Sequence, residues 1–312
     1  MIAFALGRAA TLVATLVVIA VASFFLLRAA PGGPFDEDRS VPPEIERALE
    51  AYYGLDRPVL EQLARWLAAA ARGDLGPSFK YRGRSVNEIL AAGAPASAAV
   101  GLLALEVAVL FGAGAGALAA ARSGGLADRA VRALAALGMA MPNFLWALLF
   151  AALFCLGFKL LPIHGFGRPQ HLVLPALSLA IPHASAIARL TRASLLETLE
   201  ADFVRTARAK GLSETRVVLR HALRPAFAPV VQYLGPAAAG LVTGSLAVEA
   251  VFNVPGIGAH FVNAALNRDY TLVLGTVLFY SALLLVFNAA CDLVAAWLDP
   301  RAKEVRSPGG RP

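Results

Sequence analysis

Residues 188–224 read ARLTRASLLETLEADFVRTARAKGLSETRVVLRHALR, a stretch rich in Lys and Arg that separates two apolar segments. Leu196, Leu199, Phe203 and Ala207 recur in it at helical spacing, so they would share one face of a helix. The spacing therefore predicts an amphipathic helix with charged side chains on its opposite face.

A sharp turn is predicted where this helix ends. Gly211 follows the basic residues Arg208 and Lys210, as is common for a glycine just past a helix C-terminus. Ser213 then offers a side-chain oxygen to cap a second helix over about residues 214–223. The pattern thus predicts helix, turn and helix, although an arbitrary basic loop between membrane spans more often serves only to fix topology.

The order of residues favours a more specific interpretation. Residues 202–231, DFVRTARAKGLSETRVVLRHALRPAFAPVV, resemble the cytoplasmic signature of permease subunits of ABC importers, in the branch that carries dipeptides, oligopeptides or nickel. Arg205 stands where the generic signature has an acid, and Pro225 comes one residue late. These departures are similar to those usual in the peptide branch.

In that family the helical turn is a coupling element that lies in a groove of the ATPase subunit. The resemblance therefore implies coupling helices at about residues 193–224. Leu199 and Phe203 are the expected anchors, and basic side chains are expected to pair with acids around the groove. The residues assigned to this contact are Leu199, Asp202, Phe203, Arg205, Thr206, Ala207, Arg208, Lys210 and Gly211.

Composition places the chain in a membrane. Hydrophobic residues make up 58% of it and charged residues 16%, with a mean hydropathy of +0.65. An ordinary soluble domain is less apolar. A net charge of +7 could indicate nucleic-acid binding. The basic residues are dispersed among apolar spans, however, so no nucleic-acid partner is expected. Cys155 and Cys291 both lie in apolar spans, which argues against a disulfide or a zinc site.

Six transmembrane helices are predicted, so the fold class is all-α and polytopic, and the resemblance implies the type I ABC importer permease fold. The first apolar run is long enough for a full span and too long for the core of a signal peptide. Met141-Pro142-Asn143 should kink the third span rather than end it, and Gly112 and Gly116 form a small-xxx-small pair suited to close helix packing. The spans cover about residues 9–27, 94–121, 133–158, 172–187, 226–248 and 271–298.

Lys and Arg concentrate in the loops on one side of these spans, so both termini are predicted to be cytoplasmic. Residues 1–30 then form the first transmembrane helix, 31–92 an extracytoplasmic helical insert, 93–300 a five-helix permease core and 301–312 a cytoplasmic tail. The insert has helical spacing over residues 43–51 and 57–71. It either meets a substrate-binding protein at the external mouth or packs on the bundle as a lid, and the sequence leaves both interpretations open.

Four polar residues in or near the spans are candidates for the translocation path or a gate: Glu106, Glu249, Asn253 and Asp292. An intramembrane acid is costly without burial or a partner, so Glu106 either lines the path or is hydrogen-bonded between helices. Glu249 and Asn253 lie near the start of residues 248–270, VEAVFNVPGIGAHFVNAALNRDY. This stretch resembles the family's short external helix that re-enters toward the pore. Their alternative role is helix capping.

Motifs for catalysis or energy supply are missing from the sequence. It has no GxxxxGKS or GxxxxGKT and no Gly-Lys pair at all, so the chain cannot form a Walker A phosphate loop. HExxH, GxSxG and CxxC are also absent, and neither a metal site nor a bound cofactor is expected. ATP and Mg are therefore expected on partner ATPase subunits, and the chain itself is not expected to be an enzyme.

The expected function is that of a transmembrane permease subunit of an ATP-driven, binding-protein-dependent importer in the inner or plasma membrane. Di- or oligopeptides are the expected cargo, carried by alternating access. The resemblance implies a second homologous permease chain, two ATPase chains, an extracytoplasmic substrate-binding protein and membrane lipid as partners. The alternatives are the same machinery carrying nickel or another small solute, and an ion-coupled secondary transporter that uses Glu106 and Asp292.

Overall fold

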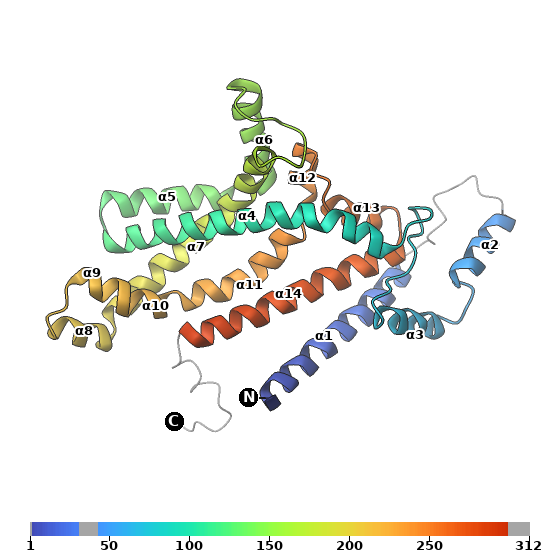
Figure 1. The fold of residues 1–312 in the computed structure, drawn as a ribbon, viewed down its shortest axis with the longest axis horizontal. Helices are drawn as coiled ribbons and strands as arrows, with labels where there is room; N and C mark the ends of the chain where they lie inside the picture. The colour runs from blue at the N-terminus through green and yellow to red at the C-terminus, as the bar shows by residue number, and fades with distance from the viewer. Residues whose placement is uncertain (1, 31–42, 299–312) are drawn as a thin grey trace. The chain divides into compact units, whose positions relative to one another are not determined.

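The computed structural model describes residues 2–30 and 43–298, and most of these are helical (Figure 1). The predicted cytoplasmic tail, 301–312, and the first part of the predicted insert, 31–42, lie outside the described residues. The described part of the chain contains no strand, so the predicted all-α class is confirmed. The helices are α1 (Ile2–Ala29), α2 (Pro43–Tyr53), α3 (Val59–Ala70), α4 (Val86–Ala121), α5 (Leu126–Ala140), α6 (Asn143–Phe150), the π-helical η1 (Ala151–Gly157), α7 (Gln170–Glu200), α8 (Asp202–Ala209), α9 (Glu214–Arg216), the π-helical η2 (Val217–Ala222), α10 (Leu223–Ala226), α11 (Ala228–Val242), α12 (Leu246–Phe252), α13 (Gly258–Leu266) and α14 (Tyr270–Leu298).

Four of the described helices are long and apolar enough to cross a membrane: α1 over Ala10–Ala29, α4, α7 and α14. Two more crossings require bent pairs of helices. One pair joins α5 to α6 and η1 at 100°, and the other joins Glu214–Ala226 to α11 at 46°. Six spans therefore remain a prediction, as do the sides of the membrane on which the two termini lie.

The junction of α5 and α6 differs from the kink predicted at Met141-Pro142-Asn143. Helix α5 ends at Ala140, Met141 is extended with ψ 129°, and α6 begins at Asn143. A residue that precedes proline is disfavoured in the helical region, and proline has no N–H with which to continue a helix. The prediction of one kinked helix is thus wrong, because these residues form two helices at 100°.

The chain forms two compact units, and the first consists of Met1–Pro95 with Gly256–Leu285. Its core is a cluster in which Val86 and Ile89 at the start of α4 pack with Leu272 at the start of α14, all three fully buried. The apolar starts of α4 and α14 therefore hold this unit together.

Asp269, immediately before α14, organises the polar part of the same unit. Its side chain is fully buried and accepts hydrogen bonds from the Phe79 and Lys80 backbone N–H groups, at 3.1 and 3.3 Å, and from the Ser78 hydroxyl. It also accepts the Leu272 N–H at 3.1 Å, as a carboxylate at a helix N-terminus does. One carboxylate thus ties the loop that follows α3 to the first turn of α14.

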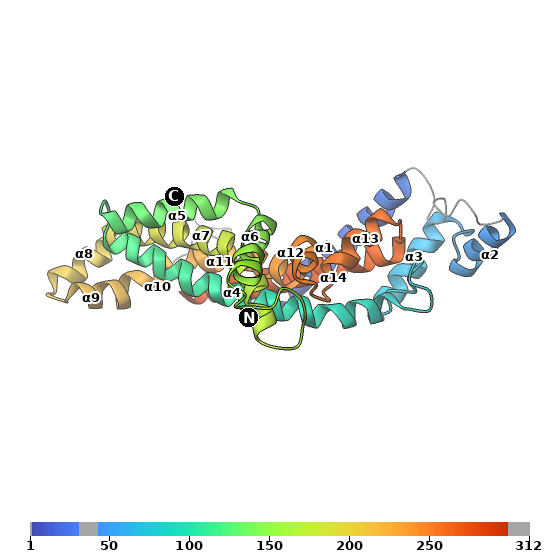
Figure 2. The same cartoon turned by 90° about the horizontal axis from the view of Figure 1, so that it is seen from above.

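The second unit consists of Ala96–Pro255 with Val286–Pro312. Within it α4 and α7 approach so closely that a Cβ at Gly112 would lie 2.6 Å from the Ala184 carbonyl oxygen, and one at Gly116 would lie 2.5 Å from that of Ala188. No side chain fits such a gap, so the predicted small-xxx-small pair does pack against another helix. Helix α5 lies beside α7 in both views (Figures 1 and 2).

Candidate functional site

The polar stretch forms the end of the second unit, where α8 and α9 lie together beyond the C-terminal end of α7 (Figure 1). The single amphipathic helix that was predicted is divided in two. Helix α7 ends at Glu200, Ala201 is extended with ψ 148°, and α8 starts at Asp202. Neither proline nor glycine marks this break, so no local residue pattern predicts it.

The predicted turn after α8 is confirmed. Gly211 has φ +79°, a left-handed conformation that glycine adopts without steric cost, and its N–H donates to the Arg208 carbonyl at 2.9 Å. Ser213 stands at the N-cap of α9 with an extended backbone, but its side chain makes no capping hydrogen bond. The turn is therefore set by Gly211, and the capping role predicted for the Ser213 hydroxyl is wrong.

The apolar face of α8 packs on the chain itself. Val204 is fully buried and Ala207 is 6% exposed, and both join a cluster that includes Leu195 of α7 and Val217 of η2. Leu199 and Phe203, the predicted anchors for a partner, are half-buried against the same cluster. This face therefore seats α8 on its own unit and leaves little of Leu199, Phe203 or Ala207 for another protein.

The opposite face of α8 is open and charged. The side chains of Asp202 and Arg205 are 98% and 70% exposed, and their charged atoms lie 3.5 Å apart. Thr206 donates its hydroxyl to the Asp202 carbonyl at 2.9 Å, which holds that side chain on the helix. Six of the nine residues assigned from the sequence are exposed here: Asp202, Arg205, Thr206, Arg208, Lys210 and Gly211.

Arg208 has an internal role that the sequence did not reveal. Its Nε donates to Glu214 Oε1 at 2.6 Å, and its Nη1 donates to the Leu199 carbonyl at 3.2 Å. One guanidinium thus joins α8 to the start of α9 and to the last turn of α7. Arg208 closes the helix-turn-helix as a unit, while the guanidinium of Arg205 remains directed to the surface.

An ion pair connects α7 to α5. Arg192 donates from Nε to Asp128 Oδ1 at 2.6 Å and from Nη2 to Oδ2 at 2.8 Å, and the Gly124 N–H adds a bond of 2.9 Å to Oδ2. The Asp128 side chain is only 2% exposed. Such a two-pronged contact fixes direction as well as distance. Its partners are 64 residues apart, so no spacing pattern predicts it.

The four candidates for the path or gate have different surroundings. Glu106 lies on the exposed face of α4, and no hydrogen bond or ion pair joins it to any other described residue. Glu249 on α12 is 5% exposed and accepts a hydrogen bond of 2.6 Å from the Ser97 hydroxyl of α4. Glu106 is nine residues beyond Ser97, roughly 13 Å further along the α4 axis. The structure therefore separates these two acids.

The other two candidates, Asn253 and Asp292, differ in exposure and in position on their helices. Asn253 is exposed and has φ +50°, and it ends α12 in the left-handed conformation. Asparagine tolerates that conformation better than most residues, so its backbone fits the alternative role of helix capping. Asp292 is half-buried on α14. Ser97 was not predicted as a site residue, because a small polar residue in an apolar helix carries no specific signal.

Metal-binding clusters of three or more His, Cys, Asp or Glu side chains are not found within residues 2–30 and 43–298. Cys155 and Cys291 are both free thiols. His183 of α7 shares a hydrogen bond of 2.8 Å with the Tyr233 hydroxyl of α11, so it acts as a packed, bonded residue between two helices.

Comparison with known proteins connects this geometry to a family. The model of the family described as binding-protein-dependent transport system inner membrane component matches residues 112–304. The chain is 42% identical over 305 residues to the oligopeptide transport system permease protein OppB of Haemophilus influenzae and to that of Escherichia coli, with 97% of this chain and 100% of each relative covered. It is 41% identical over 290 residues to the dipeptide transport system permease protein DppB of Bacillus subtilis, with 93% and 94% covered.

Proposed function

The chain belongs to the family of binding-protein-dependent transport system inner membrane components, and we propose that it is the permease subunit of an ATP-driven peptide importer. The observation that carries the proposal is 42% identity along nearly the whole chain to permeases named for oligopeptide transport. A dipeptide permease is similar to almost the same degree, which supports short peptides as the cargo class without a choice of length.

The partners proposed are a second homologous permease chain, two ATPase chains that bind ATP and Mg, and an extracytoplasmic substrate-binding protein. The sequence lacks a Walker A phosphate loop, so ATP hydrolysis belongs to other chains of the complex. This chain then contributes a path through the membrane and a surface through which the ATPase acts on that path. It is not itself an enzyme in this proposal.

The exposed face of α8 is the surface proposed for the ATPase contact. Arg205 and Lys210 present positive charge on a helix whose other face is buried against its own unit. Charged side chains around a docking surface govern register and association rate more than total affinity. The contact with the ATPase is therefore proposed to involve the exposed residues of α8 and of the turn that follows it. Val204 and Ala207, which are buried, hold α8 in place on its own unit.

The contacts behind α8 make the segment suitable for transmitting a displacement. Val204 packs into the cluster shared with α7, and Arg208 fastens α8 to the ends of α7 and α9. Packed interfaces shift as rigid bodies between discrete arrangements rather than deforming continuously. A movement of α8 is thus passed to α7, and the Asp128–Arg192 pair passes it on to α5. This sequence of contacts is the proposed route from ATP hydrolysis to alternating access.

Glu106 and Glu249 receive different proposed roles in transport. The exposed carboxylate of Glu106 lies on a candidate span, and exposure to lipid would be costly, so it is placed at the path or at the second permease chain. If Glu106 lines the path, its carboxylate can pair with the terminal ammonium group of a peptide. Glu249, buried and bonded to Ser97, is proposed to hold α12 against α4 at a gate.

Reconstituted transport tests this function. We expect proteoliposomes that contain the whole complex to accumulate a labelled tripeptide when ATP and the binding protein are present, with no uptake when the ATPase chains are omitted. An ion-coupled carrier would instead take up peptide without ATPase chains and would stop when the proton gradient is dissipated. Equal uptake with and without ATP would contradict the proposal.

A further inference from the structure

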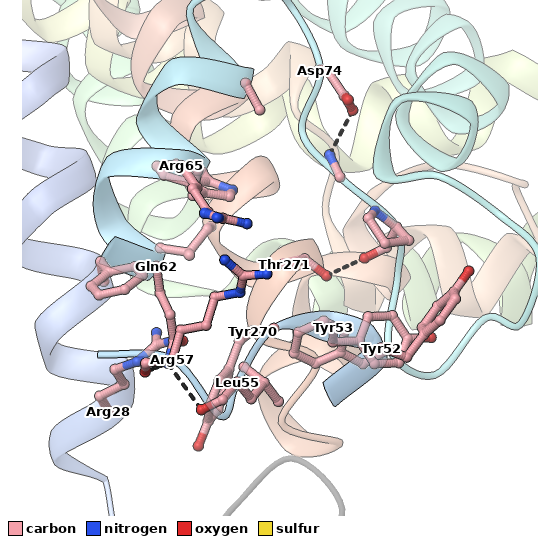
Figure 3. A pocket seen from close by; sticks show the side chains of 18 of the residues that line it. Arg28, Tyr52, Tyr53, Leu55, Arg57, Gln62, Arg65, Asp74, Tyr270 and Thr271 are labelled. Atoms are coloured by element: carbon pink, nitrogen blue, oxygen red, sulfur yellow. Dashed lines mark hydrogen bonds between the residues drawn. The ribbon is translucent and has the colours of Figure 1, made fainter. Parts of the chain in front are cut away.

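The first unit contains a cavity of about 380 Å³ that none of the proposed transport steps uses. Its walls come from the end of α1, the turn between α2 and α3, helix α3, the loop that follows it, and the start of α14 (Figure 3). These segments are distant in sequence, and the Asp269 hydrogen bonds to Phe79 and Leu272 fix two of them to each other. The cavity is thus part of a structured region.

Positive charge predominates in the lining of this cavity. Among the described residues, Arg28, Arg57 and Arg65 contribute guanidinium groups to the lining and Asp74 contributes a carboxylate. Arg57 and Arg65 extend toward each other in Figure 3 and share a single carboxylate, Glu61, at 2.9 Å each. The hydrogen bond from Arg57 lowers the pKa of Glu61. Because Arg57 and Arg65 share one carboxylate, some of their N–H donors remain available to a second anion.

The wall of the cavity also contains a buried polar atom. The indole Nε1–H of Trp66, which also lines the cavity, is buried and has no acceptor among the described residues. A buried donor without an acceptor costs roughly 1–3 kcal/mol. An oxyanion in the cavity would supply acceptors for the guanidinium groups, in the forked geometry that arginine offers.

The lining also changes character along its depth. Phe24 and Leu274 belong to candidate membrane spans, and Arg28 is close to the end of the first of these, Ala10–Ala29. Arg57 and Arg65 lie outside the spans, on either side of the start of α3. Tyr53, Tyr270 and Trp66 also line the cavity, and tyrosine and tryptophan are enriched at membrane interfaces. The cavity therefore combines residues of candidate spans, aromatic residues and arginines, which are the residue types that meet the acyl chains, the interface and the head group of a phospholipid.

We propose that this cavity binds the phosphate group of an anionic phospholipid from the membrane leaflet nearest Arg28. Arg57 and Arg65 hold the phosphate, and Arg28, which lies 3.9 Å above the centre of the Phe24 ring, adds a third guanidinium group at the end of α1. A bound lipid would join the insert to α1 and α14. This inference does not depend on which solute the chain transports.

Native mass spectrometry of the purified complex tests the site, with phosphatidylglycerol and phosphatidylcholine supplied as equimolar probes. The wild-type complex is expected to retain phosphatidylglycerol in preference. The double substitution Arg57→Ala and Arg65→Ala should reduce retention by at least about fivefold, since each basic side chain near an anionic surface contributes on the order of 1 kcal/mol. Arg72→Ala is the matched control, because Arg72 is an exposed arginine of the same region that does not line the cavity.

The remaining outcomes discriminate between sources of the oxyanion. Displacement of the lipid by millimolar inorganic phosphate or by a free tripeptide would assign the site to a soluble anion and overturn the lipid proposal. Equal lipid retention by the double variant and by Arg72→Ala would also overturn it. The double substitution Arg57→Lys and Arg65→Lys keeps the charge but removes the fork, so intermediate retention of phosphatidylglycerol is expected. Retention equal to that of the wild type would contradict the role of the guanidinium groups.

Discussion

Replacing Gly211 with proline is expected to abolish ATP-driven uptake and the co-purification of ATPase chains, while the protein still inserts into the membrane. Gly211 has φ +79°, and proline is fixed near −65°, so the chain after Lys210 would have to leave in another direction. Proline also removes the N–H that donates to the Arg208 carbonyl. Both changes separate α8 from α9 and displace the surface proposed for the ATPase contact.

Two controls show whether the effect belongs to this turn. Gly73→Pro is closely matched, because Gly73 has φ +81°, its N–H donates to a carbonyl three residues earlier at 2.9 Å, and a Cβ there would also meet open space. Gly73→Pro should keep the ATPase chains bound. Gly211→Asn, which tolerates the left-handed conformation, should retain most uptake. Wild-type uptake by Gly211→Pro would rule out α8 as the coupling element.

The second large effect is expected at Asp269. Asp269→Ala leaves the Ser78 hydroxyl and the N–H groups of Phe79, Lys80 and Leu272 without their acceptor in a buried site. Buried donors that lose a charged acceptor cost about 1.5–3 kcal/mol apiece, and partial entry of water offsets some of this. We expect a loss of about 3 kcal/mol or more in the stability of the first unit.

Thermal melting of the purified complex and limited proteolysis of the loop around Ser78 measure this loss. Asp74→Ala is the matched control, since Asp74 is an exposed acid in the same region that accepts a single hydrogen bond, from Gly76 N at 2.9 Å. Asp269→Asn keeps one acceptor oxygen, so its melting temperature should lie between those of Asp269→Ala and Asp74→Ala. If Asp269→Ala melted and was cleaved like Asp74→Ala, the carboxylate would not be organising this unit.

The sequence was sufficient for the features that depend on local chemistry. Gly211 was expected to turn the chain, and it adopts the left-handed conformation that makes the turn. Gly112 and Gly116 were expected to pack, and they admit the backbone of α7. In each case the absence of a side chain is itself the signal, because glycine adopts a positive φ and admits a neighbouring helix without steric cost.

Features that depend on distant residues were not accessible in this way. Helical spacing identified the apolar face of the polar stretch but not what covers it, and Phe203 and Ala207 turned out to pack on the chain's own cluster. The break at Ala201 carries no proline or glycine. Tertiary packing decided both, since a cluster that receives α7, α8 and η2 at once requires a change of direction between them.

The same limit applies to charge. Arg208 was assigned to the partner from its position in the stretch, yet it binds Glu214 and the Leu199 carbonyl. Asp128 pairs with Arg192, which is 64 residues away. A sequence shows that charges are present, whereas their pairing is decided by which helices become neighbours.

The central claim is that the exposed face of α8 contacts the ATPase. Its most direct test is a photo-crosslinking residue in place of Arg205 in the intact complex in membranes, with the same residue in place of Arg72 as the control. The account predicts an ATPase adduct from position 205 and none from position 72. An adduct from position 205 to the extracytoplasmic binding protein, or an ATPase adduct from position 72 alone, would contradict it.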